Sequence, residues 1–276
     1  MAKTEYPIKT SADEFTRLEI QADLFRDDAR EMLGRIGDGS GLRVLDLCCG
    51  IGGITDVLSE WVGAKGHVLG ADLDTVKLDH ARTWAGENGL TNVEFVEANA
   101  FDSGLPSRDF DLAHTRFALS VIPNGFGILD HMLTLVRPGG VIFVEEVNTF
   151  TMECAPANKD WDQALKLLKD TFSEIGADTR MGLALRGVFL EKGLTNIEVK
   201  PCLHALTARD PMALHLPMTL AAMRDAIIPL RLIGGKELDE LIARVTAHLM
   251  RPETMTISYS MVQVVGRMTG RSISKI

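Results

Sequence analysis

The chain has 276 residues, of which 46% are hydrophobic, and a formal net charge of −9 at pH 7. This size and apolar content suffice for one large domain. The acidic balance and the scattered basic residues argue against nucleic acid as a partner. No apolar run approaches the ~18 residues of a membrane span, and the N-terminal segment lacks the apolar core of a signal peptide. We therefore expect a cytoplasmic protein with no membrane partner.

The four cysteines argue against a metal site. They stand at positions 48, 49, 154 and 202, with no Cys-x-x-Cys pair and no accompanying pair of histidines. Zinc sites and redox pairs need such spacings. We expect no metal, and we expect the two adjacent cysteines to act as small residues of a tight turn.

The first predicted element is a helix over residues 11–35. Ser11 and Glu14 have the spacing of a capping box, and an apolar stripe follows them. Together with the segment before it, this helix forms an expected N-terminal cap over residues 1–38.

A strand, a glycine turn and a helix come next, over residues 44–61. The apolar run 44–47 contains Asp46 and leads into Cys48-Cys49-Gly50-Ile51-Gly52-Gly53. This order is typical of an open parallel sheet, in which ligands bind outside the carboxyl ends of the strands. The glycines let a ligand approach the backbone closely. The turn lacks the dinucleotide pattern G-x-G-x-x-G, and Asp46 disfavours an anionic ligand, so a nicotinamide-dependent oxidoreductase is the weaker alternative.

Polar side chains follow the next two predicted strands. Strand 67–74 contains Asp72, which can accept hydrogen bonds from both hydroxyls of a ribose, whereas Asp74 has the position of a helix N-cap. The alternative is that Asp72 is only a turn carboxylate. Strand 93–98 runs into Asn99, Ala100 and Phe101.

Two further strands complete a βαβ rhythm that extends to residue 147. They are predicted over residues 109–117 and, after the turn Arg137-Pro138-Gly139-Gly140, over residues 141–146. Alternating strands and helices imply a parallel sheet that is covered on both faces. Later strands are expected at 196–200 and 255–265. The predicted fold is α/β, with a Rossmann-like, mostly parallel seven-stranded sheet and helical insertions at 148–182 and 208–253.

Residues 40–147 resemble the class I S-adenosylmethionine-dependent methyltransferases. Their first motif, (D/E)-x-G-x-G-x-G, corresponds to residues 46–52, and the strand ends and the Pro-Gly-Gly turn follow in register. The chain departs from the family at Cys48, where glycine is preferred, and at Asn99, where Asp is frequent. Because Cys48 carries a side chain, we expect its φ to be negative.

The resemblance implies a set of cofactor contacts. Asp46 and the glycine turn would lie under the methionine part, Asp72 and Leu73 at the ribose, and the residues after the third strand at the adenine. In many relatives an N-terminal segment folds over the cofactor and supplies a tyrosine or an arginine to its carboxylate, and Tyr6 and Arg17 are the residues in question here. The expected cofactor-binding residues are Tyr6, Asp46, Cys48, Gly50, Gly52, Asp72, Leu73, Asn99, Ala100, Phe101 and Arg116.

Catalytic groups are harder to choose. His114 and Glu145 stand at strand ends and are the candidates for a catalytic base, although His114 is equally well explained as a core histidine. Glu145 and its neighbour Glu146 face opposite sides of their strand, so only one can point at the site. Arg116 can hold a carboxylate or pair with an acidic side chain.

The resemblance implies transfer of a methyl group from S-adenosylmethionine to an oxygen, nitrogen or carbon atom of a small molecule, with S-adenosylhomocysteine as the product. The alternative is a protein of the same fold that binds the cofactor for cyclisation, elimination or regulation. The whole chain, 1–276, is expected to form one such domain, with the two insertions as a substrate lid. A homodimer is compatible with the sequence.

Overall fold

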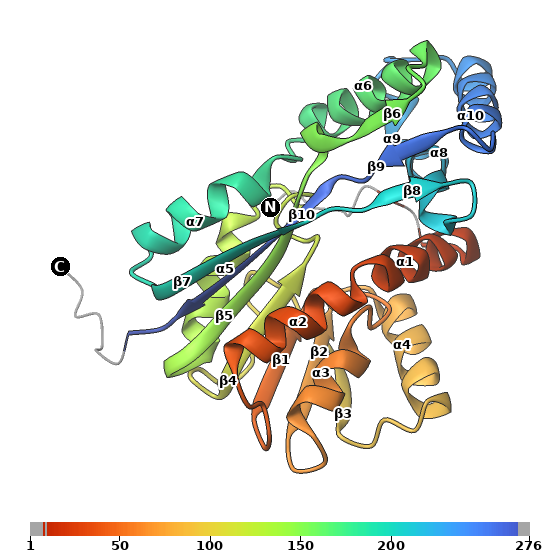
Figure 1. Cartoon of the computed structure of the whole chain (residues 1–276). Coiled ribbons are helices and arrows are strands. Elements are labelled where there is room, and N and C mark those ends of the chain that lie inside the picture. The colour runs from red at the N-terminus through yellow and green to blue at the C-terminus, as the bar shows by residue number, and fades with distance from the viewer. Residues whose placement is uncertain (1–7, 9, 270–276) are drawn as a thin grey trace.

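The computed structural model describes residue 8 and residues 10–269. Its main sheet is formed by β1 (Arg43–Leu47), β2 (His67–Asp72), β3 (Val93–Glu97), β4 (Phe110–Arg116), β5 (Val136–Asn148), β7 (Thr195–Cys202) and β10 (Ser260–Arg267). The strand order is β3-β2-β1-β4-β5-β10-β7 (Figure 1). The first five strands are parallel, and β10 runs antiparallel to β5 and β7. The predicted Rossmann-like, mostly parallel seven-stranded sheet is confirmed.

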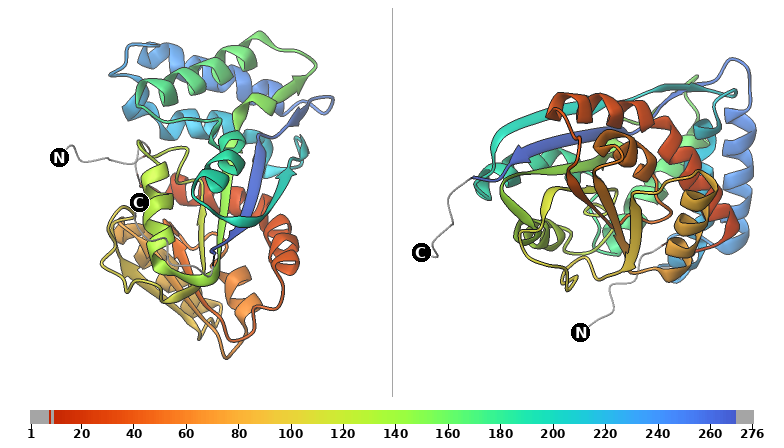
Figure 2. Two further views of the ribbon diagram at one scale, coloured as in Figure 1. Left: turned by 90° about the vertical axis from the view of Figure 1, so that its left-hand side faces the viewer. Right: turned by 90° about the horizontal axis from the view of Figure 1, so that it is seen from below.

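Helices cover both faces of this sheet (Figure 2). Successive residues of a strand point to opposite faces, so Val44 packs in the core beneath α2 (Arg26–Ile36) and α3 (Thr55–Val62). Its neighbour Leu45 packs in the core beneath α5 (Phe126–Leu135) and α7 (Met181–Glu191). The helix α4 (Thr75–Glu87) packs beside β3. Because the central strands are buried on both faces of the sheet, their sequences are continuous apolar runs.

The N-terminal helix is interrupted, contrary to the single helix predicted over 11–35. The chain forms α1 (Ala12–Leu24), breaks at Phe25 and continues as α2. Ser11 accepts a hydrogen bond from the Glu14 N–H at 3.2 Å, as the capping box predicted. Phe25 is fully buried, and its ring stacks on Tyr259 at 5.5 Å between centroids. The break allows α1 to leave the sheet and reach the second layer of the molecule.

That second layer, which we call the insertion layer, is formed by the segments that follow β5 and β7. Figures 1 and 2 show it at the end of the sheet where β5 finishes and β10 begins. It has its own hydrophobic core. Its elements are η1 (Thr149–Thr151), β6 (Glu153–Ala155), α6 (Lys159–Glu174), β8 (Ala205–Thr207), η2 (Pro211–Leu214), α8 (His215–Ala222), α9 (Arg224–Ile227), α10 (Gly235–Leu249) and β9 (Met255–Ile257).

The insertion layer contains a small sheet that the sequence did not predict. Its order is β6-β9-β8, and both pairings are antiparallel. The strand expected over 255–265 is therefore two strands in two sheets, β9 and β10. Between them Ser258 donates its N–H to His204, and Ser260 donates its N–H to Thr151. These contacts turn the chain from one sheet into the other. In the part of the chain that the structure describes, no helix is long and apolar enough to cross a membrane.

Candidate functional site

The glycine loop, residues 48–53, joins β1 to α3 at the carboxyl edge of the sheet. Cys49 donates its N–H to the Ala71 carbonyl at 3.1 Å, which ties the loop to β2. Cys48, Gly50 and Gly52 have φ values of 61°, 56° and 86°. A Cβ added at Gly50 would meet no heavy atom within 4 Å, so there is free space beside the loop.

The expectation of a negative φ at Cys48 is wrong. The backbone at this position has the left-handed conformation that a glycine would adopt without cost, and Cys48 adopts it although it carries a side chain. Such a conformation costs roughly 1–2 kcal/mol for a residue other than glycine. The hydrogen bonds and packing of the surrounding loop must offset that cost.

Asp72, at the end of β2, is hydrogen-bonded to the glycine loop. Its Oδ2 accepts from the Gly50 N–H at 2.8 Å, and its Oδ1 accepts from the Asp74 N–H at 2.9 Å. Each carboxylate oxygen retains acceptor capacity for a ligand hydroxyl. The adjacent Leu73 is 61% exposed. As predicted, Asp74 is the N-cap of α4 and accepts from the N–H groups of Val76 and Lys77.

The residues after β3 form a tight turn at the same edge. Asn99 is exposed, and its Oδ1 accepts from the Phe101 N–H at 2.9 Å. Ala100 and Phe101 are half-buried and pack against the main core. The Asn99 side chain thus shapes the turn and presents its remaining polar atoms at the surface.

A buried row of charged side chains crosses the sheet next to the loop; we call it the central polar network. His114 on β4 has one ring nitrogen 2.8 Å from Asp46 Oδ1 and the other 3.0 Å from Glu145 Oε2. Arg116 Nε donates to the same Glu145 oxygen at 2.7 Å, and Gln263 donates to the other at 2.7 Å. Sheet register explains the row, because Asp46 lies beside His114, and Glu145 lies between Arg116 and Gln263.

The comparison with known families decides the identity of this fold. A family model described as "Methyltransferase domain" matches residues 38–189, more than half of the chain. The chain belongs to this methyltransferase family. The resemblance to class I S-adenosylmethionine-dependent methyltransferases is confirmed, and with it the cofactor class.

Individual relatives agree with this membership. The chain is 33% identical over 132 residues to the demethylmenaquinone methyltransferase of Lactococcus lactis subsp. lactis, an alignment that covers 48% of this chain and 51% of that protein. It spans about half the length of the curated relatives it matches. A methyltransferase from Aquifex aeolicus has the same fold (16% identity, TM-score 0.51, covering 92% of this chain and 99% of that one). The [4+2]-cyclase SpnF also shares it (16% identity, TM-score 0.51, covering 88% and 81%).

The central polar network does not support His114 or Glu145 as a catalytic base. Each His114 nitrogen faces a carboxylate oxygen, so both contacts are hydrogen bonds only when the ring carries two protons. Burial opposes that charge, but Asp46 and Glu145 outweigh it and raise the pKa of His114. Burial would raise the pKa of Glu145, yet Arg116 and His114 lower it to about 2. His114 has no free lone pair, and both oxygens of Glu145 already accept hydrogen bonds.

Two of the predicted cofactor-binding residues, Asp46 and Arg116, also belong to this network. Asp46 is 3% exposed and bonded to His114, and the Arg116 guanidinium is paired with Glu145. Arg116 Nη1 is buried without a hydrogen-bond partner among the described residues. The structure therefore places Asp46, on β1, and Arg116, at the end of β4, within the central polar network. Tyr6 lies outside the described residues.

Glu146 follows Glu145 on β5 and therefore faces the other side of the sheet. It is fully buried and accepts hydrogen bonds from the Leu119 and Ser120 N–H groups at 2.6 and 3.3 Å. Burial raises the pKa of Glu146 to about 7. Sequence reasoning preferred Glu145; only the fold shows that Glu146 anchors the segment after β4 and is the carboxyl group that titrates near neutrality.

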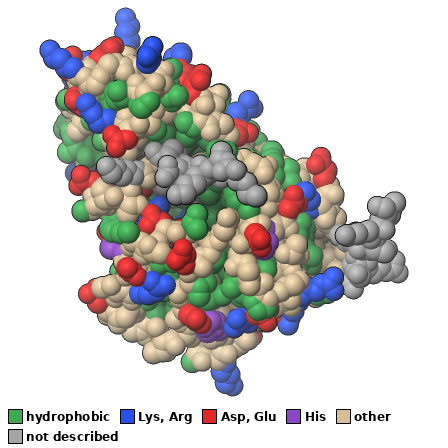
Figure 3. Space-filling view, turned by 180° about the vertical axis from the view of Figure 1, so that it is seen from behind, with side chains coloured by type: hydrophobic (Ala, Val, Ile, Leu, Met, Phe, Trp, Pro, Cys, Tyr) green, Lys and Arg blue, Asp and Glu red, His purple; other side chains and the backbone are tan. Residues whose placement is uncertain are grey.

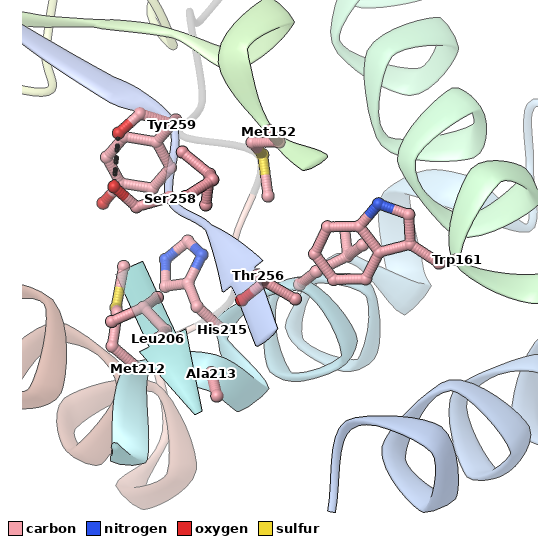
Figure 4. A pocket seen from close by; sticks show the side chains of 11 residues that line it. Met152, Trp161, Leu206, Met212, Ala213, His215, Thr256, Ser258 and Tyr259 are labelled. Carbon is pink, nitrogen blue, oxygen red and sulfur yellow. Dashed lines mark hydrogen bonds between the residues drawn. The ribbon is translucent and has the colours of Figure 1, made fainter. Parts of the chain in front are cut away.

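Two hollows lie near these elements. One, of about 310 Å³ including its mouth, is on the outer side of the glycine loop, between the loop, α1 and α4, and Arg26, His80 and Trp84 are among its lining residues. The other lies in the insertion layer (Figure 4). Among the described residues, no group of three or more His, Cys, Asp or Glu side chains is arranged to hold a metal ion.

Proposed function

We propose that this protein transfers the methyl group of S-adenosylmethionine to an oxygen, nitrogen or carbon atom of a small molecule. The observation that carries the proposal is the hydrogen bond between the Gly50 N–H and Asp72, 2.8 Å long. It fixes the glycine loop against the carboxylate at the end of the next strand. These two features are the parts of the fold that the methionine and ribose portions of the cofactor would contact.

The residues at this edge fit the cofactor. Free space beside Gly50 leaves room for the methionine part next to Cys48 and Gly52, with Asp46 buried below. Asp72 and the exposed Leu73 would hold the ribose, because a carboxylate can accept from two neighbouring hydroxyls. The proposed adenine contacts, from the turn after β3, are Asn99, Ala100 and Phe101, and Arg116 and Tyr6 complete the proposed set.

The proposed mechanism relies on positioning. When bound, S-adenosylmethionine supplies a methyl group on a positively charged sulfur. The residues of the chain hold the reactants in line and exclude water, which can supply much of the acceleration. The central polar network holds the ends of β1, β4 and β5 in register below the reacting groups.

We further propose that the insertion layer, which contains the segments 148–182 and 208–253, acts as a substrate lid over the single domain. A small-molecule acceptor also agrees with the surface, because on the face seen in Figure 3 the Lys and Arg side chains are interspersed with Asp and Glu. We propose neither nucleic acid nor membrane as a partner. The four cysteines are free thiols, which supports a reducing, cytoplasmic location. The homodimer stays a prediction.

The proposal is tested by incubating the protein with S-adenosylmethionine carrying a tritiated methyl group and a panel of uncharged aromatic and aliphatic acceptors. Transfer of tritium to an acceptor, with release of S-adenosylhomocysteine, is the expected result. Binding of S-adenosylhomocysteine without transfer to any acceptor would favour the alternative, a cofactor-binding protein with a non-methylating role. The Asp72→Ala variant, which removes the ribose contact, is the negative control.

A further inference from the structure

The carboxyl group of Glu146 is fully buried at the end of β5 and is bonded to the backbone of another segment. Its Oε1 accepts from the Leu119 N–H at 2.6 Å, and its Oε2 accepts from the Ser120 N–H at 3.3 Å. Hydrogen bonds of this kind, from backbone N–H groups to a carboxylate, are stronger than those between neutral groups. Glu146 therefore fastens residues 117–125, which join β4 to α5 and which we call the β4–α5 loop.

The β4–α5 loop is tightly folded. It contains a single turn that is closed by the hydrogen bond from the Ile122 N–H to the Ala118 carbonyl, 3.0 Å long. The loop ends at Gly125, where a Cβ would collide with the Leu119 carbonyl group. The end of the loop thus packs directly on its beginning. Glu146 binds the first N–H groups of the turn, which a helical turn leaves without backbone partners.

The β4–α5 loop determines where α5 begins, and α5 packs on a proposed adenine contact. The helix starts directly after Gly125. A Cβ at Gly127, in the first turn, would lie 3.1 Å from the Phe101 ring, so the helix backbone packs against that ring. Leu119 is buried in the hydrophobic core against which Phe101 packs. The hydrogen bonds of Glu146 are therefore connected to Phe101 through the loop and the start of α5.

The charge of Glu146 also acts on the glycine loop. Cys48, the first residue of that loop, packs against the same core as Phe101. Burial raises the pKa of the Cys48 thiol, and Glu146 is one of three carboxylates whose negative charge raises it further. Glu146 is therefore close enough to influence the loop that would lie under the methionine part of the cofactor.

Other charged side chains near Glu146 are directed elsewhere. On β5, Glu145 faces the opposite side of the sheet, and the neighbour of Glu146 on β10 is Val262. Residues 117–125 contain no titratable side chain. Charged residues of α5 and of the start and end of α7 have other partners: Asp130 with Lys192, Asp178 with the Arg180 N–H, and Arg180 with the Phe150 ring.

We propose that Glu146 is a positioning residue for methyl transfer, which holds the β4–α5 loop so that Phe101 and the glycine loop keep the geometry that binds S-adenosylmethionine. This inference rests on the proposed function and adds to it a buried residue that acts through the loop.

The ionisation state of Glu146 determines how firmly it holds the loop. A carboxylate accepts from both N–H groups, whereas a protonated carboxyl group uses one of its oxygens as a donor. Burial raises the pKa of Glu146 to about 7, although the hydrogen-bond donors of residues 118–120 oppose this shift. The loop is therefore held by two full hydrogen bonds above this pH and more weakly below it.

The direct test measures hydrogen exchange in the β4–α5 loop of the full chain without a ligand. In mass spectrometry at pH 8, peptides that cover residues 117–125 should exchange at least about tenfold faster in Glu146→Gln than in the wild type. Peptides from α10 should exchange equally in both proteins and control for global destabilisation. Equal exchange of the loop in the two proteins overturns the proposal.

Calorimetric titration with S-adenosylhomocysteine provides the functional readout. The affinity of the wild type should rise at least about threefold from pH 6 to pH 8, because the carboxyl group ionises over this range. In Glu146→Gln the affinity should be about tenfold weaker at pH 8 and independent of pH. Glu153→Gln, an exposed substitution on β6, should keep the wild-type profile. A carboxyl group with only a structural role would change stability and leave the pH profile of binding unchanged.

The wild-type comparison of pH 6 with pH 8 needs no variant, so it decides the question even if Glu146→Gln does not fold. A wild-type affinity that does not change with pH contradicts the positioning role and leaves the proposed function standing. Absence of S-adenosylhomocysteine binding at both pH values contradicts the proposed function itself, and the positioning role with it.

Discussion

His114 shows how one residue can be interpreted in two ways from sequence and in only one way from structure. A histidine at a strand end is a plausible base, but here it is an imidazolium between Asp46 and Glu145. With Arg116 included, the network has two positive and two negative charges and is neutral as a whole. Buried charges are tolerated in this way, when each is paired and hydrogen-bonded.

Replacing His114 should therefore leave the two carboxylates with one cation. We expect His114→Gln to lower the free energy of unfolding by about 3–5 kcal/mol at pH 7, the usual cost of breaking a buried ion pair. Urea denaturation measures the difference. His80→Gln, at a partly exposed position on α4, is the control and should change stability by less than about 1 kcal/mol. Equal effects of the two substitutions would show that the network contributes little.

For Glu146 we predict an effect on the pH dependence of stability. Its pKa rises from an ordinary value of 4.5 to about 7 in the folded protein, so the folded state binds the proton more tightly than the unfolded state. Its contribution to stability is fully present below pH 4.5 and is lost as the pH rises through about 7. The stability difference between wild type and Glu146→Gln should fall by roughly 3 kcal/mol over this range.

Urea denaturation at a series of pH values measures that difference. Glu153→Gln, an exposed substitution on β6, controls for general effects of removing a carboxylate. A difference between wild type and Glu146→Gln that stays constant with pH would mean that the pKa of Glu146 is the same in the folded and unfolded states.

Among the elements, the glycine loop has the strictest backbone requirements. Gly52 has a φ of 86°, and a Cβ at this position would lie 3.3 Å from the Thr55 hydroxyl oxygen. The adjacent Gly53 has no such φ, and a Cβ there would meet only Ala22 at an ordinary distance of 3.6 Å. The backbone conformation therefore requires a glycine at position 52 but not at position 53.

Substituting them separately should reveal this difference. We expect Gly52→Ala to cost about 1–2 kcal/mol of stability, the cost of a left-handed conformation for a residue with a side chain, and to weaken S-adenosylhomocysteine binding. Gly53→Ala should change stability by no more than about 0.5 kcal/mol. Thermal and urea unfolding of both variants provide the measurement. The prediction fails if Gly53→Ala is as damaging as Gly52→Ala.

At the scale of the whole molecule, local patterns predicted the sheet and its first five strands because those signals are local. Apolar runs, N-caps such as Asp74 and the Pro-Gly-Gly turn each act over a few residues. What the sequence did not reveal depends on contacts between distant segments. The break at Phe25 depends on Tyr259, the split between β9 and β10 depends on pairing with β6 and β8, and the roles of His114 and Glu145 depend on strand register.

The candidate site, like the fold, could be predicted only in part from the sequence. The strand ends that bear Asp72 and Asn99 could be located from the sequence, because parallel strands bring their carboxyl ends to one edge. The hydrogen bonds that these residues make could not be predicted, and neither could the left-handed φ of Cys48. The small hollow in the insertion layer could not be predicted either, because its lining residues come from segments about a hundred residues apart in the chain.

Calorimetric titration of the wild-type protein with S-adenosylhomocysteine, with NADH as the matched control, tests the central claim most directly. The account predicts micromolar binding of S-adenosylhomocysteine, no binding of NADH, and a loss of about 1–3 kcal/mol in binding free energy in Asp72→Ala, where a charged acceptor is removed. Binding of NADH without binding of S-adenosylhomocysteine would contradict the account.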